Sequence, residues 1–163
     1  MGPKKTILVA MASTDYCQGI FDYTVTLAVA LDADIIVASI INERDINAVR
    51  QIASMGYKID GENYTADVKA ARKQDIDTIM AGSNFPQQRV RTIVKVGNPV
   101  DELLKLVVAE SVDMVVMGIK GRTDLEHIFT GSVAEKLFRK SPATIVSYRN
   151  ENQAEKLKKR IHL

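Results

Sequence analysis

Cysteine is nearly absent from this chain, and its scarcity excludes two classes of protein. It occurs once, at Cys17, so an intramolecular disulfide is impossible and a metal cage of several thiolates is excluded. We expect Cys17 to be a buried or half-buried small side chain near a helix start. The two histidines, His127 and His162, lie far apart and have no partners at ligand spacing, so no metal site is expected.

Long apolar runs are also missing. No stretch approaches the roughly 20 residues that cross a membrane. The first residues, Met-Gly-Pro-Lys-Lys-Thr, are followed at once by a short β-like run, which is not the layout of a signal peptide. The sequence therefore predicts a cytoplasmic protein without a membrane span.

Most of the chain has no excess of charge of one sign. The formal net charge is +2, and residues 151–163 alone contain four basic and two acidic residues, so the body is neutral. A neutral body argues against nucleic-acid binding, which needs a basic face. Within this tail Ala154, Leu157 and Ile161 recur at helical spacing, which predicts a terminal helix with a solvated charged face. A contact of the tail with a partner, a membrane surface or a nucleic acid stays open.

Length and composition fit a single globular domain. The chain has 163 residues, of which 46% are hydrophobic and 26% charged. A domain of this size buries roughly two-thirds of the surface of its unfolded chain. We assign residues 1–150 to one α/β domain and residues 151–163 to a basic tail.

Strand-like and helix-like stretches alternate along the domain. Five short apolar runs read as buried strands, at residues 5–11, 33–41, 91–96, 112–117 and 143–148. The stretch between 42 and 85 is polar and helix-compatible, with a break at 55–64 and Ala53, Ile76 and Ile79 as core contacts. Asn98 and Pro99 mark a helix start as cap and first residue. This order predicts an open, doubly wound parallel sheet with helices on both faces.

Glycine is scarce, with nine in the chain, yet three of them fall within residues 118–132. Gly118 directly follows a predicted strand, at the edge where such sheets bind ligands. Gly131 and Ser132 open the next helix, whose free amides and serine hydroxyl suit a phosphate. Ser132 and Glu135 also fit a capping box that needs no ligand, so both interpretations stay open. The patterns of a P-loop and of a dinucleotide fingerprint are both absent.

Three stretches in this order resemble the universal stress protein family over roughly residues 4–149: "ILVAM", "VGNPVDELL" and "DMVVMGIKGRTDLEHIFTGSVAEKLFRKSPATIVSYR". The spacing Gly118-x2-Gly121-x9-Gly131-Ser132 is similar to that of the ATP-binding branch of the family. The resemblance implies a five-stranded parallel sheet of order 3-2-1-4-5 and a homodimer formed through the last strand, residues 143–148. It also implies ATP bound across the strand ends, with any Mg²⁺ arriving with the nucleotide.

The resemblance assigns residues to this site. It implies that the ribose and phosphates are surrounded by Gly118, Gly121, Gly131, Ser132 and Val133, with Met117 beside them. Ala10 and Ile40 match positions that line the adenine pocket. Lys120 and Arg122 flank the loop glycines and could neutralise phosphate charge.

The sequence departs from the family pattern at Ala12. Family members that bind ATP usually have an aspartate there, which contacts the nucleoside. The alanine predicts either a weaker affinity for the nucleotide or a different preferred base.

Three functions follow from these observations. The leading hypothesis is a regulatory nucleotide-binding stress protein, in which ATP orders residues 119–130 and changes the surface presented to an unidentified protein partner. The second is a slow ATPase or phosphotransferase, although the motif offers no clear residue to position water, so we do not favour an enzyme. The third is a nucleotide-free dimeric interaction protein, for which Ala12 is the best sequence argument.

Overall fold

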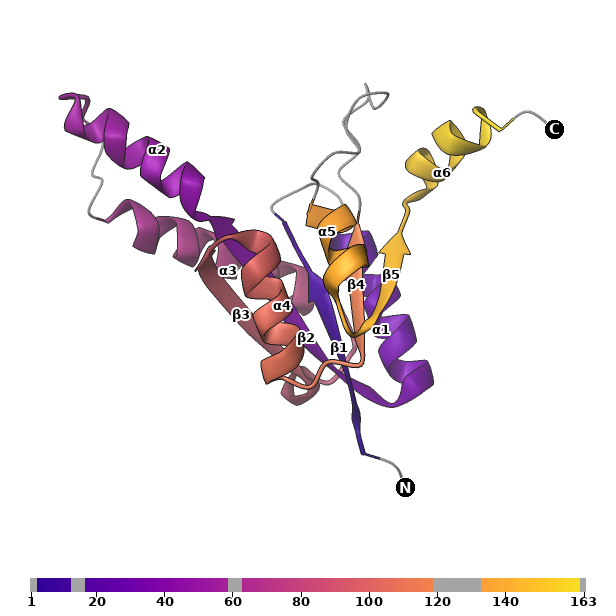
Figure 1. Cartoon of the computed structure of the whole chain (residues 1–163). Helices are drawn as coiled ribbons and strands as arrows, with labels where there is room; N and C mark the ends of the chain where they lie inside the picture. Colours follow the sequence, from indigo (N-terminus) through magenta and orange to yellow (C-terminus); the bar gives the residue numbers. More distant parts are fainter. Residues whose placement is uncertain (1–2, 13–16, 59–62, 119–132, 162–163) are drawn as a thin grey trace.

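The computed structural model describes residues 3–12, 17–58, 63–118 and 133–161 (Figure 1). Gly121, Arg122, Gly131 and Ser132 therefore lie outside the described residues. Along the chain the elements are β1 (Lys5–Ala10), α1 (Cys17–Leu31), β2 (Ala33–Asn42), α2 (Glu43–Ser54), α3 (Tyr64–Ala81), the short 3-10 helix η1 (Gln87–Arg89), β3 (Val90–Gly97), α4 (Pro99–Ala109), β4 (Met114–Gly118), α5 (Val133–Lys140), β5 (Thr144–Tyr148) and α6 (Glu151–Lys158).

The strands form one parallel sheet of order β3-β2-β1-β4-β5. This confirms the predicted fold class and strand order. β1 lies at the centre of the sheet, and β3 and β5 are its two edges. All five strands run the same way, so the chain enters β1 at one end of the sheet and leaves β5 at the opposite end (Figure 1).

Helices cover both faces of the sheet, and alternate strand residues enter two separate cores. Ile7 and Val9 pack toward α1 and α3, in a cluster that includes Phe21 and Ile76. Leu8 packs on the other side, in a cluster that contains residues of α4 and α5. We call these sides the α1–α3 face and the α4–α5 face.

Two neighbouring strands each end at an asparagine that caps the following helix. Asn98 follows β3, and its side-chain oxygen accepts hydrogen bonds from the backbone N–H groups of Val100 at 3.0 Å and Asp101 at 3.2 Å, as predicted. Asn42 ends β2 and caps α2 by accepting from the N–H of Arg44 at 3.0 Å. These caps begin α4 and α2 at the same edge of the sheet, where Asn42 is opposite Gly97.

The polar stretch between β2 and β3 forms two helices, and the gap between them falls at the predicted break. Ile76 is buried in the core and Ile79 is partly buried against it, as expected. Ala53 is only half-buried, because α2 extends away from the sheet and Ile46 is its buried residue (Figure 1). Cys17 is buried at the start of α1, as predicted, and its thiol donates to the carbonyl of Ala12 at 2.8 Å.

The tail forms the expected helix, α6, which stands clear of the sheet (Figure 1). Asn150 and Gln153 close a capping box at its start. No residue of α6 is buried, and Ile161 lies beyond its end with 66% of its surface exposed. Within the described part of the chain, no helix is both long and apolar enough to cross a membrane.

Candidate functional site

Three of the predicted site residues lie together at the carboxyl ends of three adjacent strands. Ala10 is opposite Met117 of β4 on one side and Ala38 of β2 on the other. Met117 is buried in the α4–α5 face, and Ala10 and Ile40 are partly buried against the same cluster. The structure therefore brings Ala10, Ile40 and Met117 onto one face of the sheet, while their contact with a ligand stays a prediction.

β2 extends beyond the end of β1. The last residue of β1, Ala10, pairs with Ala38, and the N–H of Met11 donates to the carbonyl of Ala38 at 2.9 Å. Backbone groups of alternate strand residues point to the same side, so the N–H and C=O of Ile40 also point toward β1. These two backbone groups of Ile40 lie beyond Ala10 and Ala38, the last pair of residues that β1 and β2 form. This overhang presents one donor and one acceptor beside the predicted base pocket.

Ala12 lies two residues beyond Ala10 and is exposed. Its methyl group stands where an acceptor for the nucleoside was expected from the family pattern. The residue therefore adds no carboxylate to this end of the sheet.

Gly118 and Val133 mark the two ends of the predicted phosphate loop. Gly118 is the last residue of β4, opposite Tyr148 of β5, and it is exposed. Val133 is the first residue of α5. The predicted loop therefore begins at the end of β4, next in sequence to Met117, and ends at α5, whose Leu137 packs in the same cluster as Met117. The phosphate-binding role of Gly121, Arg122, Gly131 and Ser132 stays a prediction.

A charged cluster of Lys95, Glu102 and Lys105 adjoins Ile40, and it was not predicted from the sequence. Lys95 lies opposite Ile40 in the register of β2 and β3. Its ammonium is 3.4 Å from the carboxylate of Glu102, which also accepts a hydrogen bond from Lys105 at 2.7 Å. The signal that could have revealed it is a lysine within the apolar strand "RTIVKV".

The charges of the cluster act on one another. The hydrogen bond from Lys105 is the main cause that lowers the pKa of Glu102, burial opposes it, and Lys95 lowers it further. The same contact raises the pKa of Lys105. The side chain of Glu102 can lie against the end of β3 because Gly97 has no side chain. A Cβ at Gly97 would be 2.8 Å from the Cγ of Glu102.

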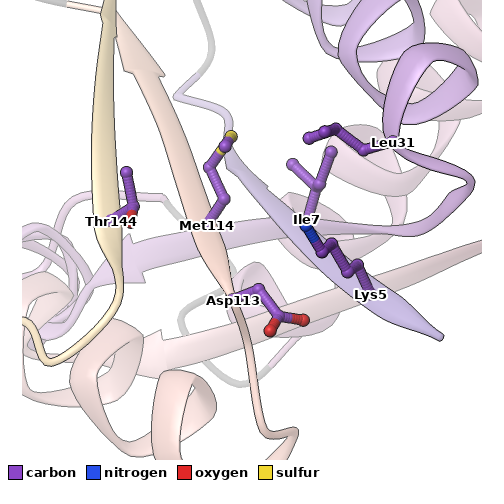
Figure 2. Close-up of a pocket in the computed structure, with 6 residues that line it drawn as sticks. All are labelled: Lys5, Ile7, Leu31, Asp113, Met114 and Thr144. Carbon is purple, nitrogen blue, oxygen red and sulfur yellow. The ribbon is translucent and has the colours of Figure 1, made fainter. Parts of the chain in front are cut away.

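A shallow hollow of about 280 Å³ lies at the other end of the sheet, where the strands begin (Figure 2). Its lining combines apolar and polar side chains: Lys5, Ile7, Leu31, Asp113, Met114 and Thr144. The carboxylate of Asp113 already accepts the backbone N–H of Thr6 at 2.8 Å. Ligands of parallel sheets bind beyond the carboxyl ends of the strands, so this hollow is not the candidate site.

Among the described residues, no group of three or more histidine, cysteine, aspartate or glutamate side chains could hold a metal ion.

Comparison with known proteins identifies the family. The profile described as the universal stress protein family matches residues 4–149. Universal stress protein MJ0577 of Methanocaldococcus jannaschii is 27% identical over 128 residues, which cover 73% of this chain and 78% of that protein. The solved structure of MJ0577 has a TM-score of 0.67 at 23% identity and covers 90% of this chain and 98% of its own.

A second solved structure, a universal stress protein in complex with cAMP, has a TM-score of 0.63 at 20% identity and covers 91% of this chain and 98% of that one. Another, from Archaeoglobus fulgidus in complex with dAMP, has a TM-score of 0.54 at 13% identity over 89% of this chain and 98% of its own. These likenesses show the fold, and the profile covers nearly the whole domain. The chain belongs to the universal stress protein family.

Proposed function

We propose that this chain is a cytoplasmic regulatory protein that binds a purine nucleotide, with ATP as the expected ligand, across the carboxyl ends of β1, β2 and β4. The base lies on Ala10 and Ile40, and Met117 lies beside the ribose and phosphates. The phosphates lie at the glycine motif, from Gly118 to Val133, through Gly121, Arg122, Gly131 and Ser132. Any Mg²⁺ is carried in by the phosphates.

One observation carries this proposal: the overhang of β2 and the start of the glycine motif at the end of β4 lie at the same end of the sheet, on the two sides of β1. The backbone N–H and C=O of Ile40 form a donor and acceptor pair that can match the edge of a purine. Small side chains at Ala10 and Ala12 leave space beside it. Related structures contain cAMP and dAMP, which supports a purine as the ligand class.

A calorimetric titration of nucleotide-stripped protein with Mg-ATP tests the proposal. Binding is expected in the parent and should disappear in Gly131→Val, because a β-branched side chain blocks a close approach of phosphate to the backbone. Ala70→Val is the matched control, since it adds the same side chain at an exposed position of α3. A folded parent that binds no purine nucleotide, or a Gly131→Val variant that binds as well as the parent, would contradict it.

The regulatory part of the proposal is that the bound nucleotide orders residues 119–130 and changes the surface that a protein partner meets. The measurement is limited proteolysis at that segment with and without saturating nucleotide. We expect fewer cuts within residues 119–130 when nucleotide is bound. An identical digestion pattern in both states would remove this mechanism.

We further propose a homodimer formed through β5. β5 is an edge strand, and the side chains of Ile145, Val146 and Tyr148 are half-buried, so one side of an apolar strand is left for a second copy. Tyr148 is fixed against α1, where its ring centre lies 5.5 Å from that of Tyr23. Sedimentation at micromolar concentration is expected to show a dimer, and a monomer alone would exclude this interface.

A further inference from the structure

Tyr148 lies where the proposed dimer edge meets the start of the glycine motif. It is the last residue of β5, and it lies opposite Gly118, the last residue of β4. Neighbouring strands of a sheet are about 4.8 Å apart and share backbone hydrogen bonds, so the end of one strand is held by the other. Gly118 begins the glycine motif, and β5 is the edge proposed to meet a second copy.

The side chain of Tyr148 packs on the first turns of α1. Its ring centre is 5.5 Å from that of Tyr23, and the planes of the two rings are tilted by 37°. Its hydroxyl lies over Gly19, where an added Cβ would be 2.6 Å from the hydroxyl oxygen. Such a Cβ would overlap with the oxygen, so the absence of a side chain at Gly19 leaves the space that Tyr148 fills.

The same part of α1 is next to both predicted parts of the nucleotide site. A Cβ added at Gly118 would be 3.8 Å from the Cδ1 of Ile20, so this part of α1 lies beside the start of the glycine motif. Cys17, the first residue of α1, donates its thiol to the carbonyl of Ala12, which stands at the position of the family's nucleoside contact. Tyr148 therefore packs on a segment that borders the base end and the phosphate end of the site.

The outer side of β5 leaves Tyr148 only partly restrained. Tyr148 is half-buried, and β5 is an edge strand of five residues. Pairing of β5 with a second copy would hold this strand end from its outer side as well. A strand end that is already held costs less conformational entropy to order around a ligand. Dimerisation should therefore favour nucleotide binding, and because such coupling is reciprocal, the nucleotide should favour the dimer.

We infer that Tyr148 is a positioning residue that couples nucleotide binding to dimerisation, through its pairing with Gly118 and its contacts with α1. The inference rests on the proposed function, since it requires both the nucleotide at the glycine motif and the dimer through β5. It gives the bound nucleotide a second effect, a tighter dimer, besides the ordering of residues 119–130.

The test is sedimentation of the parent over a series of concentrations, with and without saturating Mg-ATP. The nucleotide is expected to lower the dissociation constant of the dimer about fivefold or more, the lower end of typical coupling between two sites. An unchanged dissociation constant would overturn the inference and leave the nucleotide site and the dimer standing. A folded parent that binds no nucleotide, or that stays monomeric, would overturn that part of the proposed function and this inference with it.

The variant Gly19→Ala tests whether the coupling depends on Tyr148. The added methyl group meets the Tyr148 hydroxyl and displaces the ring, so this variant should lose most of the coupling. The double variant Gly19→Ala/Tyr148→Phe removes the hydroxyl and should restore the coupling, because the ring carbon that carried it lies 3.4 Å from the added methyl group, an ordinary contact. The coupling is a ratio of two dissociation constants of one variant, so a simple loss of stability does not change it.

Gly82→Ala is the matched control, because its methyl group would make only ordinary contacts, of 3.6 Å or more, at the end of α3. It should keep the coupling of the parent. Full coupling in a folded Gly19→Ala protein, or no recovery of coupling in the double variant, would contradict the role of Tyr148.

Discussion

The two ends of the sheet use their polar groups differently. At the amino end, Arg89 closes the start of β2: its guanidinium contacts Asp34 at 2.8 Å, Asp32 at 3.0 Å and the carbonyl of Ala33 at 2.9 Å. Its guanidinium carbon also lies 5.4 Å from the centre of the Phe85 ring. All of these partners belong to the chain itself, so the contacts of Arg89 at this end of the sheet stabilise the fold.

At the start of β4, the polar groups of Asp113 are also paired within the chain. The backbone N–H of Asp113 donates to the carbonyl of Thr6 at 3.0 Å, and its carbonyl accepts the N–H of Thr144 at 3.2 Å. With the side-chain bond to the N–H of Thr6, this one residue joins β1, β4 and β5 where they begin.

At the carboxyl end the sheet is uneven. β2 extends past β1, the side chains of Ala10 and Ala12 at the end of β1 are small, and Lys95 shares its acidic partner with another lysine. We therefore expect stability and ligand binding to depend on opposite ends of the strands. Substitutions at the amino end are expected to change stability, and substitutions at the carboxyl end are expected to change ligand binding.

The largest effect is expected from Arg89→Met, which removes several contacts at once and leaves Asp34 with Lys4 as its cationic partner. The midpoint of urea unfolding should fall, while nucleotide affinity stays as in the parent. Arg91→Met is the matched control, because Arg91 is 58% exposed and pairs with Glu110. A lower nucleotide affinity with unchanged stability would contradict the expectation that the amino end of the sheet serves stability alone.

The next effect is expected from Ile40→Pro, on the carboxyl side. The proline removes the N–H that points past the end of β1, while the bonds to β3 use the neighbouring residues Ser39 and Ile41. Calorimetry should show nucleotide affinity lower by about three- to tenfold, the value of one hydrogen bond. Ile40→Val, which keeps the N–H, should bind as the parent does. Unchanged affinity in a folded Ile40→Pro protein would show that the overhang does not contact the base.

Lowering the pH should reduce the stability contributed by the ion pairs at both ends of the sheet, by a smaller amount than the substitutions above. Burial alone would raise the pKa of Asp34, but Lys4 and Arg89 outweigh it and hold that pKa below its ordinary value of 3.8. The pKa of Glu102 is likewise held below 4.5. A lowered pKa in the folded protein means that the unfolded chain takes up protons first, so this stability is complete above those ordinary values and is lost as the pH falls through the lowered ones.

Urea unfolding measured between pH 6 and pH 3 checks this pH dependence. Asp34→Asn and Glu102→Gln should each flatten part of the acid loss, because each removes one of the titrating groups. An unchanged slope in both variants would show that other carboxylates cause the loss.

The smallest effect is expected from deleting residues 151–163. No residue of α6 is buried, so the free energy of unfolding should change by less than about 0.5 kcal/mol. Nucleotide affinity should also be unchanged. A larger loss of stability would mean that α6 packs against a second copy of the chain in solution, and sedimentation of the shortened protein would show it.

Local signals made most of the fold predictable. The five apolar runs became the five strands, and Asn98 with Pro99 began α4 as expected, because a cap and a strand depend on neighbouring residues. The order of the strands came from the family resemblance, since the alternation of strands and helices alone does not fix which strands are neighbours. The interpretation of α2 was less complete, because a single buried residue, Ile46, leaves almost no periodic pattern.

Contacts between distant residues were the part that the sequence did not reveal. Arg89 and Asp34 are 55 positions apart, and Lys95 meets Ile40 only through the register of β2 and β3. Neither pair has a motif, because each depends on how the elements are placed in space. By contrast, Ala10, Ile40 and Met117 could be assigned from the resemblance, and the structure brings them together.

The opposite positions of the start of β1 and the end of β5 have a mechanical consequence. A pulling force applied at Lys5 and Tyr148 acts along the strands and slides β1 against β4, and β4 against β5 (Figure 1). Hydrogen bonds between parallel strands loaded in this direction share the tension and must break together. We therefore expect the domain to resist stretching strongly when a tether is attached at these two points.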